Sequence, residues 1–262
     1  MRALSTAATG MMAMQLNVQV IANNLANMTT TGYKRQRAEF QDLLYEHISR
    51  IGSQTSTQGN ILPVGIDLGS GVKTVGTPRL MSQGTLSQTG GTLDLAIRGD
   101  GFFKVQLPDG TYAYTRDGSF QMDAQGRIVT VQGNVVQPAI TIPANSTGLT
   151  INAQGQVSVI PQGSTTPTIL GQLTLTRFVN QAGLLSIGDN MYQETPASGT
   201  PQDGNPSTDG AGDLMQGSLE QSNVDSVSEI TNLIAAQRAY EMNGKVITAA
   251  DQMLQSTSQL MR

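Results

Sequence analysis

The chain has 262 residues, of which only 13% are charged, whereas an average soluble domain has about 25%. Its net charge of −4 argues against nucleic-acid binding, and with no cysteine it can form neither disulfides nor cysteine-based metal sites. A surface that is polar but sparsely charged limits self-repulsion, which suits packing against identical copies.

Neither a membrane span nor a secretory leader is evident. No stretch reaches the roughly 20 apolar residues that a transmembrane helix needs, so we expect no membrane insertion. The first residues contain one arginine but no apolar core of the signal-peptide kind. If the protein is exported, we expect a route that cleaves no leader.

Residues 1–32 are predicted to form an N-terminal assembly helix, because apolar residues recur at alternating steps of three and four. Ser5 is the expected N-cap, and Gly32, after three threonines, the expected stop. Asparagines are poor helix formers, so we interpret the three near its end either as a solvated, fraying face or as amides that bond to a neighbouring subunit. The candidate assembly residues here are Leu4, Met11, Met14, Val18, Ile21, Asn23, Asn24, Leu25 and Asn27.

Residues 33–90 are expected to form a connecting arm and a β segment. The stretch at 33–48 fits a short amphipathic helix or an extended arm equally well. Residues 52–71 carry one charge, at Asp67, and are rich in glycine, serine, threonine and glutamine, which is typical of a loop.

Residues 91–212 are predicted to form an outer all-β domain, a sandwich or barrel. Short alternating runs end at turn signals such as residues 108–110 (PDG). Residues 195–212 are expected to be loop, and 213–225 a returning segment with one strand over residues 214–220.

Residues 226–262 repeat the heptad pattern and predict a C-terminal assembly helix, opened by a capping box of Ser226 and Glu229. Asn243 in its seam is expected to fix register at some cost in stability. The candidate assembly residues here are Leu233, Tyr240, Asn243, Ile247, Leu254 and Met261. The fold class is therefore α+β: two heptad helices packed as a coiled-coil-like assembly domain, with an all-β central domain. The helices could pair within one monomer or between copies.

No catalytic, cofactor or metal site is predicted, and no enzyme activity. His47 is the single histidine and is expected to be a solvated side chain. Alternate oxygen-bearing residues from Asp203 to Asp209 resemble the start of a calcium loop, but Leu214 stands where that loop needs glutamate.

Three parts of the chain resemble the bacterial flagellar rod and hook family. They are residues 21–27 (IANNLAN) with 31–35 (TGYKR), residues 99–103 (GDGFF) with 114–120 (YTRDGSF), and residues 237–241 (QRAYE) with 251–254 (DQML). Residues 34–45, 82–89 and 137–144 look like its distal rod members, and residues 46–63 resemble an insertion that those members carry.

The resemblance implies a structural subunit of the distal rod. Such a subunit would assemble helically into a rigid hollow shaft that crosses the periplasm, transmits torque from motor to hook and leaves a central export channel. The implied partners are copies of itself, proximal rod proteins, hook protein, the L-ring and P-ring bushing, the rod cap and the flagellar type III export apparatus. The alternatives are a proximal rod or hook subunit, or a cell-wall-acting enzyme or glycan-binding module.

Overall fold

The chain forms two compact units in a computed structural model that describes residues 2–49, 64–163, 166–208 and 210–260. Unit 1 comprises Met1–Leu25, Gln36–Pro78 and Asp225–Arg262, and unit 2 comprises Ala26–Arg35 and Arg79–Val224. Of the predicted insertion at 46–63, residues 50–63 lie outside the described residues, as does Met261.

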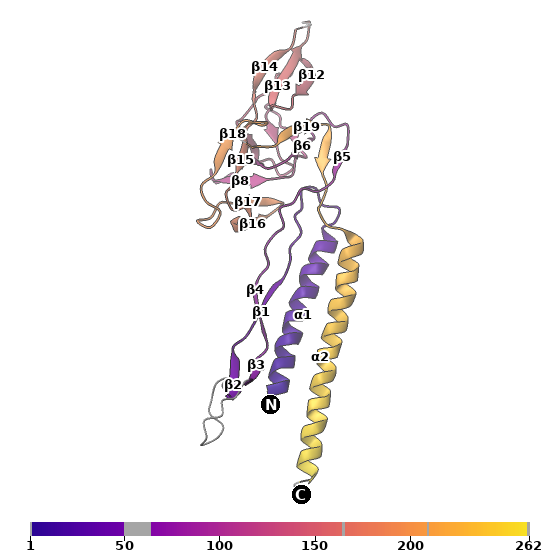
Figure 1. The fold of residues 1–262 in the computed structure, drawn as a ribbon. Helices are drawn as coiled ribbons and strands as arrows, with labels where there is room; N and C mark the ends of the chain where they lie inside the picture. Colours follow the sequence, from indigo (N-terminus) through magenta and orange to yellow (C-terminus); the bar gives the residue numbers. More distant parts are fainter. Residues whose placement is uncertain (1, 50–63, 164–165, 209, 261–262) are drawn as a thin grey trace. The chain divides into compact units, whose positions relative to one another are not determined.

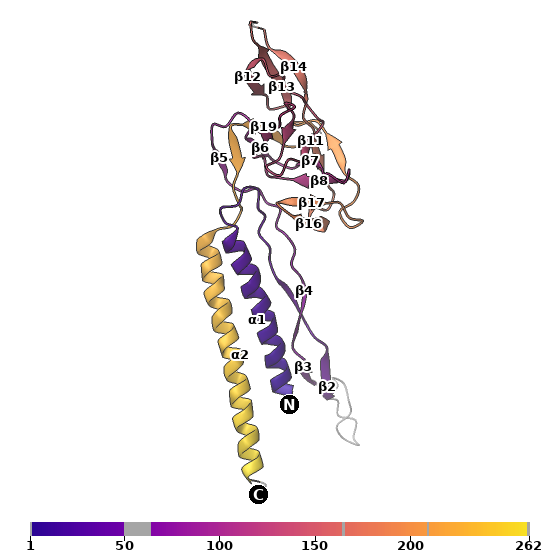
Figure 2. The same ribbon diagram turned by 180° about the vertical axis from the view of Figure 1, so that it is seen from behind.

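Unit 1 contains the two predicted helices, α1 (Arg2–Ala26) and α2 (Ser226–Leu260), which lie side by side in Figures 1 and 2. Near one end, the Asn24 amide donates to the Glu229 carboxylate at 3.2 Å. Further along, a Cβ added to Gly10 would lie 2.9 Å from Asn243 Nδ2. The numbering rises along α1 as it falls along α2, so the helices are antiparallel within one chain.

The helix ends differ from the expected caps. α1 begins at Arg2 rather than near Ser5, whose hydroxyl instead donates to the Arg2 carbonyl at 2.8 Å. At the start of α2 the capping side chain is Asp225, one residue before the predicted Ser226. Its carboxylate accepts from the Val227 amide and the Ser228 hydroxyl. Aspartate is as good an N-cap as serine, and this one also places its charge at the positive end of the helix.

The arm is extended rather than helical, which decides between the two alternatives for residues 33–48. Two antiparallel ribbons form it: β1 (Glu39–Asp42) pairs with β4 (Val72–Gly76), and β2 (Tyr45–Ser49) pairs with β3 (Ile66–Gly69). Both strands of the β2–β3 ribbon are exposed along almost their whole length. A two-stranded ribbon is marginally stable alone, so this one depends on what it packs against.

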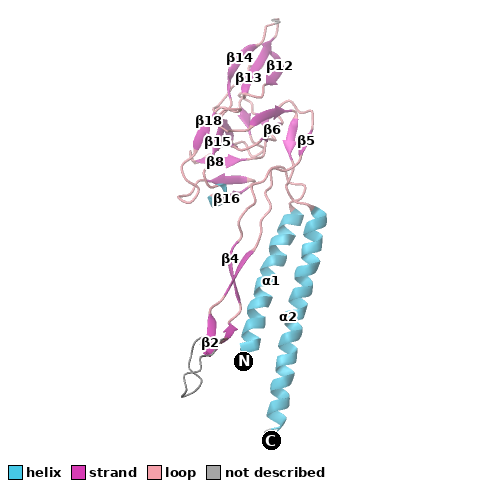
Figure 3. Ribbon diagram, in the orientation of Figure 1, coloured by secondary structure: helices cyan, strands magenta, loops and turns pink. Residues whose placement is uncertain are grey.

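Unit 2 is built from short antiparallel strands, as Figure 3 shows. Its largest sheet has nine strands among the described residues. They are β7 (Phe102–Gln106), β8 (Tyr112–Thr115), β9 (Gln121–Met122), β10 (Ile128–Val129), β11 (Val135–Gln137), β15 (Leu175–Arg177), β16 (Leu185–Gly188), β17 (Met191–Gln193) and β18 (Gln202–Gly204). A smaller sheet contains β12 (Ser146–Ile151), β13 (Gln156–Pro161) and β14 (Thr168–Gln172). Two pairs remain, β5 (Leu86–Gln88) with β20 (Ser218–Glu220) and β6 (Leu95–Arg98) with β19 (Asp213–Gln216).

The β7–β8 hairpin illustrates how the sequence sets this fold. The chain reverses at Asp109 and Gly110, where Gly110 has φ +84°, a conformation that only glycine adopts without cost. Its amide donates to the Leu107 carbonyl at 3.0 Å, and the Asp109 carboxylate accepts from the Thr111 amide at 3.0 Å. This is the turn that the sequence predicts.

The core of unit 2 is apolar and shared by its sheets. Phe103 packs edge to face on Phe120, with ring centroids 4.9 Å apart. Each such buried side chain contributes about 1.5–3 kcal/mol. A second cluster gathers the aromatic rings of Phe102, Tyr114, Phe178 and Tyr192.

The α+β prediction is confirmed, with two local corrections. The expected loop at 195–212 contains the short strand β18, and the expected single strand at 214–220 is divided into β19 and β20, with Gly217 at φ +72° between them. Within the described residues, neither helix is long and apolar enough to cross a bilayer.

Candidate functional site

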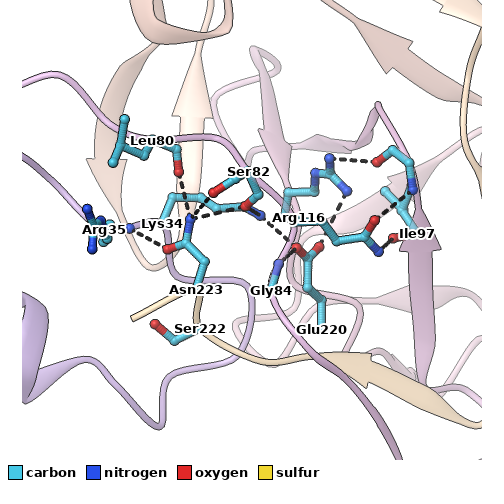
Figure 4. Close-up of polar contacts among 12 residues, drawn as sticks. Lys34, Arg35, Leu80, Ser82, Gly84, Ile97, Arg116, Glu220, Ser222 and Asn223 are labelled. Atoms are coloured by element: carbon cyan, nitrogen blue, oxygen red, sulfur yellow. Dashed lines mark hydrogen bonds and ion pairs between the residues drawn. The ribbon is translucent and has the colours of Figure 1, made fainter. Parts of the chain in front are cut away.

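Three charged side chains meet in the interior of unit 2, where Figure 4 shows Glu220 between Lys34 and Arg116. Each is at most 1% exposed. Lys34 Nζ donates to Glu220 Oε1 at 2.6 Å and to the Ser82 carbonyl at 2.8 Å. Arg116 Nη1 lies 3.4 Å from Glu220 Oε2. We call these three residues the charge cluster.

The charge cluster holds two cations against one carboxylate. Burial lowers the pKa of Lys34, and the Glu220 carboxylate opposes that effect. Burial likewise lowers the pKa of Arg116, again opposed by Glu220. Since desolvated charges are costly without partners, Glu220 is the member on which the other two depend.

Arg116 has further contacts that spread its charge. Its Nη2 donates to the Gly99 carbonyl at 2.8 Å, and its guanidinium lies 5.5 Å from the centre of the Phe102 ring. Within the described residues its Nε has no hydrogen-bond partner. A buried donor without a partner costs about 1–3 kcal/mol. The other contacts of the Arg116 side chain must offset this cost.

Asn223 ties the same region together through its side-chain amide. Its Oδ1 accepts from the Arg35 amide at 2.8 Å, and its Nδ2 donates to the Leu80 carbonyl at 2.8 Å and the Ser82 carbonyl at 3.0 Å (Figure 4). The Gly32 amide donates to the Glu220 carbonyl at 2.8 Å. Residues 32–35, 80–84 and 220–223 are thus three chain segments, distant in sequence, that are joined at one place.

Two of the sequence motifs pack directly on each other here. Gly32 has φ +68°, and a Cβ at this position would lie 2.8 Å from the Asp117 backbone nitrogen. The Asn190 side chain donates to the Thr31 carbonyl at 2.8 Å. Residues 31–35 therefore fit against residues 114–120, and only glycine fits at the point of closest approach.

In unit 1, Asn24 joins both helices and the arm. It is 1% exposed; its Nδ2 donates to the Gln36 carbonyl at 2.8 Å, and its Oδ1 accepts from the Gln36 amide at 2.9 Å. Its contact with Glu229 reaches across to α2. The Asn24 amide thus pairs within its own chain, which differs from the expectation of an amide directed at a neighbouring subunit.

The other predicted assembly residues vary in exposure. Ile21 is buried, Leu4, Met11, Met14, Val18, Leu25, Asn27, Leu233, Asn243 and Ile247 are half-buried, and Asn23, Tyr240 and Leu254 are exposed. On α2, further large apolar side chains are exposed, among them Ile234, Met242 and Met253. Pairing within one chain therefore leaves apolar helix surface uncovered.

The sequence motifs contain Lys34 and Arg116, but their pattern predicted no role for either residue. It also predicted neither the contacts of Asn223 nor the pairing of Glu220 with Lys34 and of Glu229 with Asn24. The available signal was scarcity: in a chain with only 13% charged residues, a lysine or arginine that becomes buried needs a partner of opposite charge.

The described residues contain no group of three or more histidine, cysteine, aspartate or glutamate side chains that could hold a metal ion. His47 lies on the β2–β3 ribbon and pairs with Asp67, its cross-strand neighbour, at 2.5 Å. Asp203, which the sequence placed in a loop, is in β18 and pairs with Lys104 at 2.8 Å.

Three families match parts of the sequence. Residues 4–34 match the family described as "Flagella basal body rod protein", residues 96–159 match "Flagellar hook protein FlgE/F/G D1 domain", and residues 215–260 match "Flagellar basal body rod FlgEFG protein C-terminal". The matched ranges contain all three members of the charge cluster.

Relatives match along nearly the whole chain. The flagellar basal-body rod protein FlgG of Caulobacter vibrioides is 56% identical over 99% of both chains, and FlgG of Buchnera aphidicola from Acyrthosiphon pisum is 52% identical over 96% of both. The flagellar basal-body rod protein FlgF of Caulobacter vibrioides is 36% identical over 96% of this chain and 91% of its own. These matches are to structural rod and hook proteins and not to enzymes. The chain therefore belongs to the flagellar basal-body rod protein family, and it is more similar to these FlgG members than to FlgF.

Proposed function

We propose that this protein is the subunit of the flagellar distal rod and that it assembles helically into a rigid, hollow drive shaft. The shaft transmits torque from the motor to the hook and leaves a central export channel. Membership of the rod family makes the chain a structural component of the basal body. The observation that carries the finer proposal is the pair of terminal helices, whose apolar side chains are only partly covered within one chain.

A comparison within one organism favours a FlgG-type rod subunit over a FlgF-type one. The chain is 56% identical to FlgG of Caulobacter vibrioides but 36% identical to FlgF of the same bacterium. The resemblance of residues 46–63 to an insertion of distal rod proteins points the same way. Deleting those residues should abolish the straight, rigid packing, and a deletant that still builds straight rods would contradict this part of the proposal.

The predicted assembly residues become part of this proposal. We infer that subunits contact one another through the two helices, residues 1–32 and 226–262, while the β-rich residues 91–212 form the outer surface. The connecting arm adds a second surface, since Leu44 between β1 and β2, Ile48 in β2 and Ile66 in β3 are all more than half exposed. Exposed apolar side chains that gather in one region are typical of interaction sites.

The partners follow from the location. In the rod that crosses the periplasm, the subunit would contact copies of itself, proximal rod proteins, hook protein, the L-ring and P-ring bushing and the rod cap, after passage through the flagellar type III export apparatus.

The test is assembly of the purified full-length chain at high concentration, observed by electron microscopy, together with restoration of swimming in a strain that lacks its own rod protein. Helical tubes and restored motility are expected. Tyr240→Glu places a charge on the exposed helix seam and should abolish both. Val131→Glu, at a 61% exposed position in unit 2, is the matched control and should retain them. A wild-type chain that stays monomeric and leaves the strain non-motile would refute the proposal.

A further inference from the structure

The C-terminal end of α2 extends past the start of α1. Gly10 and Asn24 lie fourteen residues apart on α1, and their α2 neighbours Asn243 and Glu229 are separated by the same number. Arg2, eight residues before Gly10, is therefore level with Asp251, eight residues after Asn243. Residues 252–260 have no counterpart on α1, and in Figures 1 and 2 the C-terminal end of α2 lies beyond the N-terminus. At 1.5 Å per residue, this overhang is about 13 Å long.

The overhang continues the surface that packs on α1. Ala236 and Ala250, on the seam of α2, are 3% and 7% exposed, and Asn243 between them lies against Gly10. The next seam position, Leu254, is 47% exposed, and Met253 beside it is 63% exposed. Residues 252–260 carry no charged side chain. The overhang is thus a helix end with an apolar stripe, no charge and no helix from its own chain to pack on.

A groove of about 560 Å³ lies in unit 1 at the start of α1. One wall is α1 from Arg2 to Ala7, the second is α2 at Asn243 and Val246, and the third is the arm at Glu46 and Leu68–Ser70. Most of these side chains are small, so another helix can approach closely. The only charges, Arg2 and Glu46, pair with each other at 2.7 Å and leave the groove without net charge.

We propose that the overhang of one copy docks into the groove of a second copy. An uncharged apolar stripe suits a neutral groove lined by small side chains, because burying it strands no charge. The overhang cannot fill the groove of its own chain, since it is the straight continuation of the helix that forms one wall. Overhang and groove are different surfaces, so each docked copy presents a free overhang or groove to the next. Contacts of this type build open helical polymers or rings.

This inference rests on the proposed self-assembly and names the segments that make the contact. The absence of native cysteine allows a direct test with single-cysteine variants. Leu254→Cys is mixed with Ser70→Cys or, separately, with Thr6→Cys, both of which line the groove. Each mixture is assembled and mildly oxidised. Because each chain carries one thiol, a disulfide between two different variants can only join two molecules. Electron microscopy of the same samples reports whether polymers form.

We expect heterodimers with at least one groove variant, and only background with Val179→Cys, an 82% exposed control in unit 2. Leu254→Glu should raise the concentration needed for assembly at least tenfold, whereas Gln252→Glu, on the opposite face of the helix, should leave it unchanged. Polymers without heterodimers at either groove position would overturn the docking while leaving the proposed function intact. A complete lack of polymers would overturn the proposed function and the docking with it.

Discussion

The charge cluster gives the sharpest prediction about stability. Replacing Glu220 with glutamine preserves the shape of the side chain but removes the carboxylate that, within the described part of the chain, pairs with both Lys34 Nζ and Arg116 Nη1. The introduced glutamine would also turn an NH₂ group toward one of these two donors. Both cations would then be buried without a counter-charge in contact.

The magnitude follows from that burial. Removing one partner of a buried ion pair costs about 3–5 kcal/mol, since the remaining charge is desolvated and unpaired. All three members are at most 1% exposed, so solvent screening offers little relief. A loss of this size is a large part of the roughly 5–15 kcal/mol by which folded domains are stable. Glu220→Gln is therefore expected to bring unit 2 close to unfolding.

Urea unfolding of the monomer, at concentrations too low for assembly, measures the effect. The chain has no tryptophan, so near-ultraviolet circular dichroism reports its tyrosines, two of which pack in the aromatic cluster of unit 2. Asp213→Asn, which breaks an exposed pair with Arg98, is the control and should cost less than about 1 kcal/mol. Adding Lys34→Met to Glu220→Gln should recover part of the loss. If Glu220→Gln unfolds within about 1 kcal/mol of the parent, the reasoning is wrong.

Four further outcomes are expected. Asn24→Ala removes both hydrogen bonds to the backbone of Gln36 and should destabilise unit 1 by about 1–3 kcal/mol. Hydrogen exchange of the amides at the end of α1 should become faster, and an unchanged rate would count against this role of Asn24. Gly32→Ala forces a side chain onto φ +68° and against packed backbone, and should cost more than about 1 kcal/mol in urea, unlike the same change at open Gly76. Asn243→Leu should alter the helical geometry of the polymer, and unchanged geometry by electron microscopy would argue against a register role. Arg98 lowers the pKa of Asp213 below its ordinary value of 3.8, so their ion pair stabilises the fold above about pH 4. This stabilisation is small and is lost as the pH falls through the lower pKa of the folded state. In urea titrations at several pH values, Arg98→Ala should therefore show a smaller loss of stability on acidification than the parent.

The helices and the main turns could be predicted because their signals are local. Steps of three and four residues identify α1 and α2, and the turn at Asp109-Gly110 identifies the β7–β8 hairpin. The arm could not be assigned, since an exposed two-stranded ribbon buries no face and so shows no alternation of apolar and polar residues. The N-cap was misplaced by one residue because Asp225 and Ser226 are both good capping residues.

The contacts that hold the fold together were harder to foresee. Lys34 and Glu220 are separated by 186 residues, and Asn24 and Glu229 by 205. No pattern within a window of the sequence links such residues, although the motifs around Lys34 and Arg116 marked the correct part of the chain. Of the heptad positions of α2, Ala236 and Ala250 are buried, whereas Tyr240 and Leu254 are exposed, so the role of the seam in contacts between subunits stays a prediction.

The separation between Lys34 and Glu220 also has a consequence for timing. A chain that reaches its destination unfolded, as the proposed export route requires, cannot close the charge cluster until residue 220 has emerged. Closing a loop of this length costs conformational entropy before any contact compensates for it, and such long-range contacts slow folding. Until then, Lys34 and Arg116 remain hydrated and unit 2 lacks the carboxylate that joins its three segments. The cluster would therefore form late, after the first 220 of the 262 residues have been delivered.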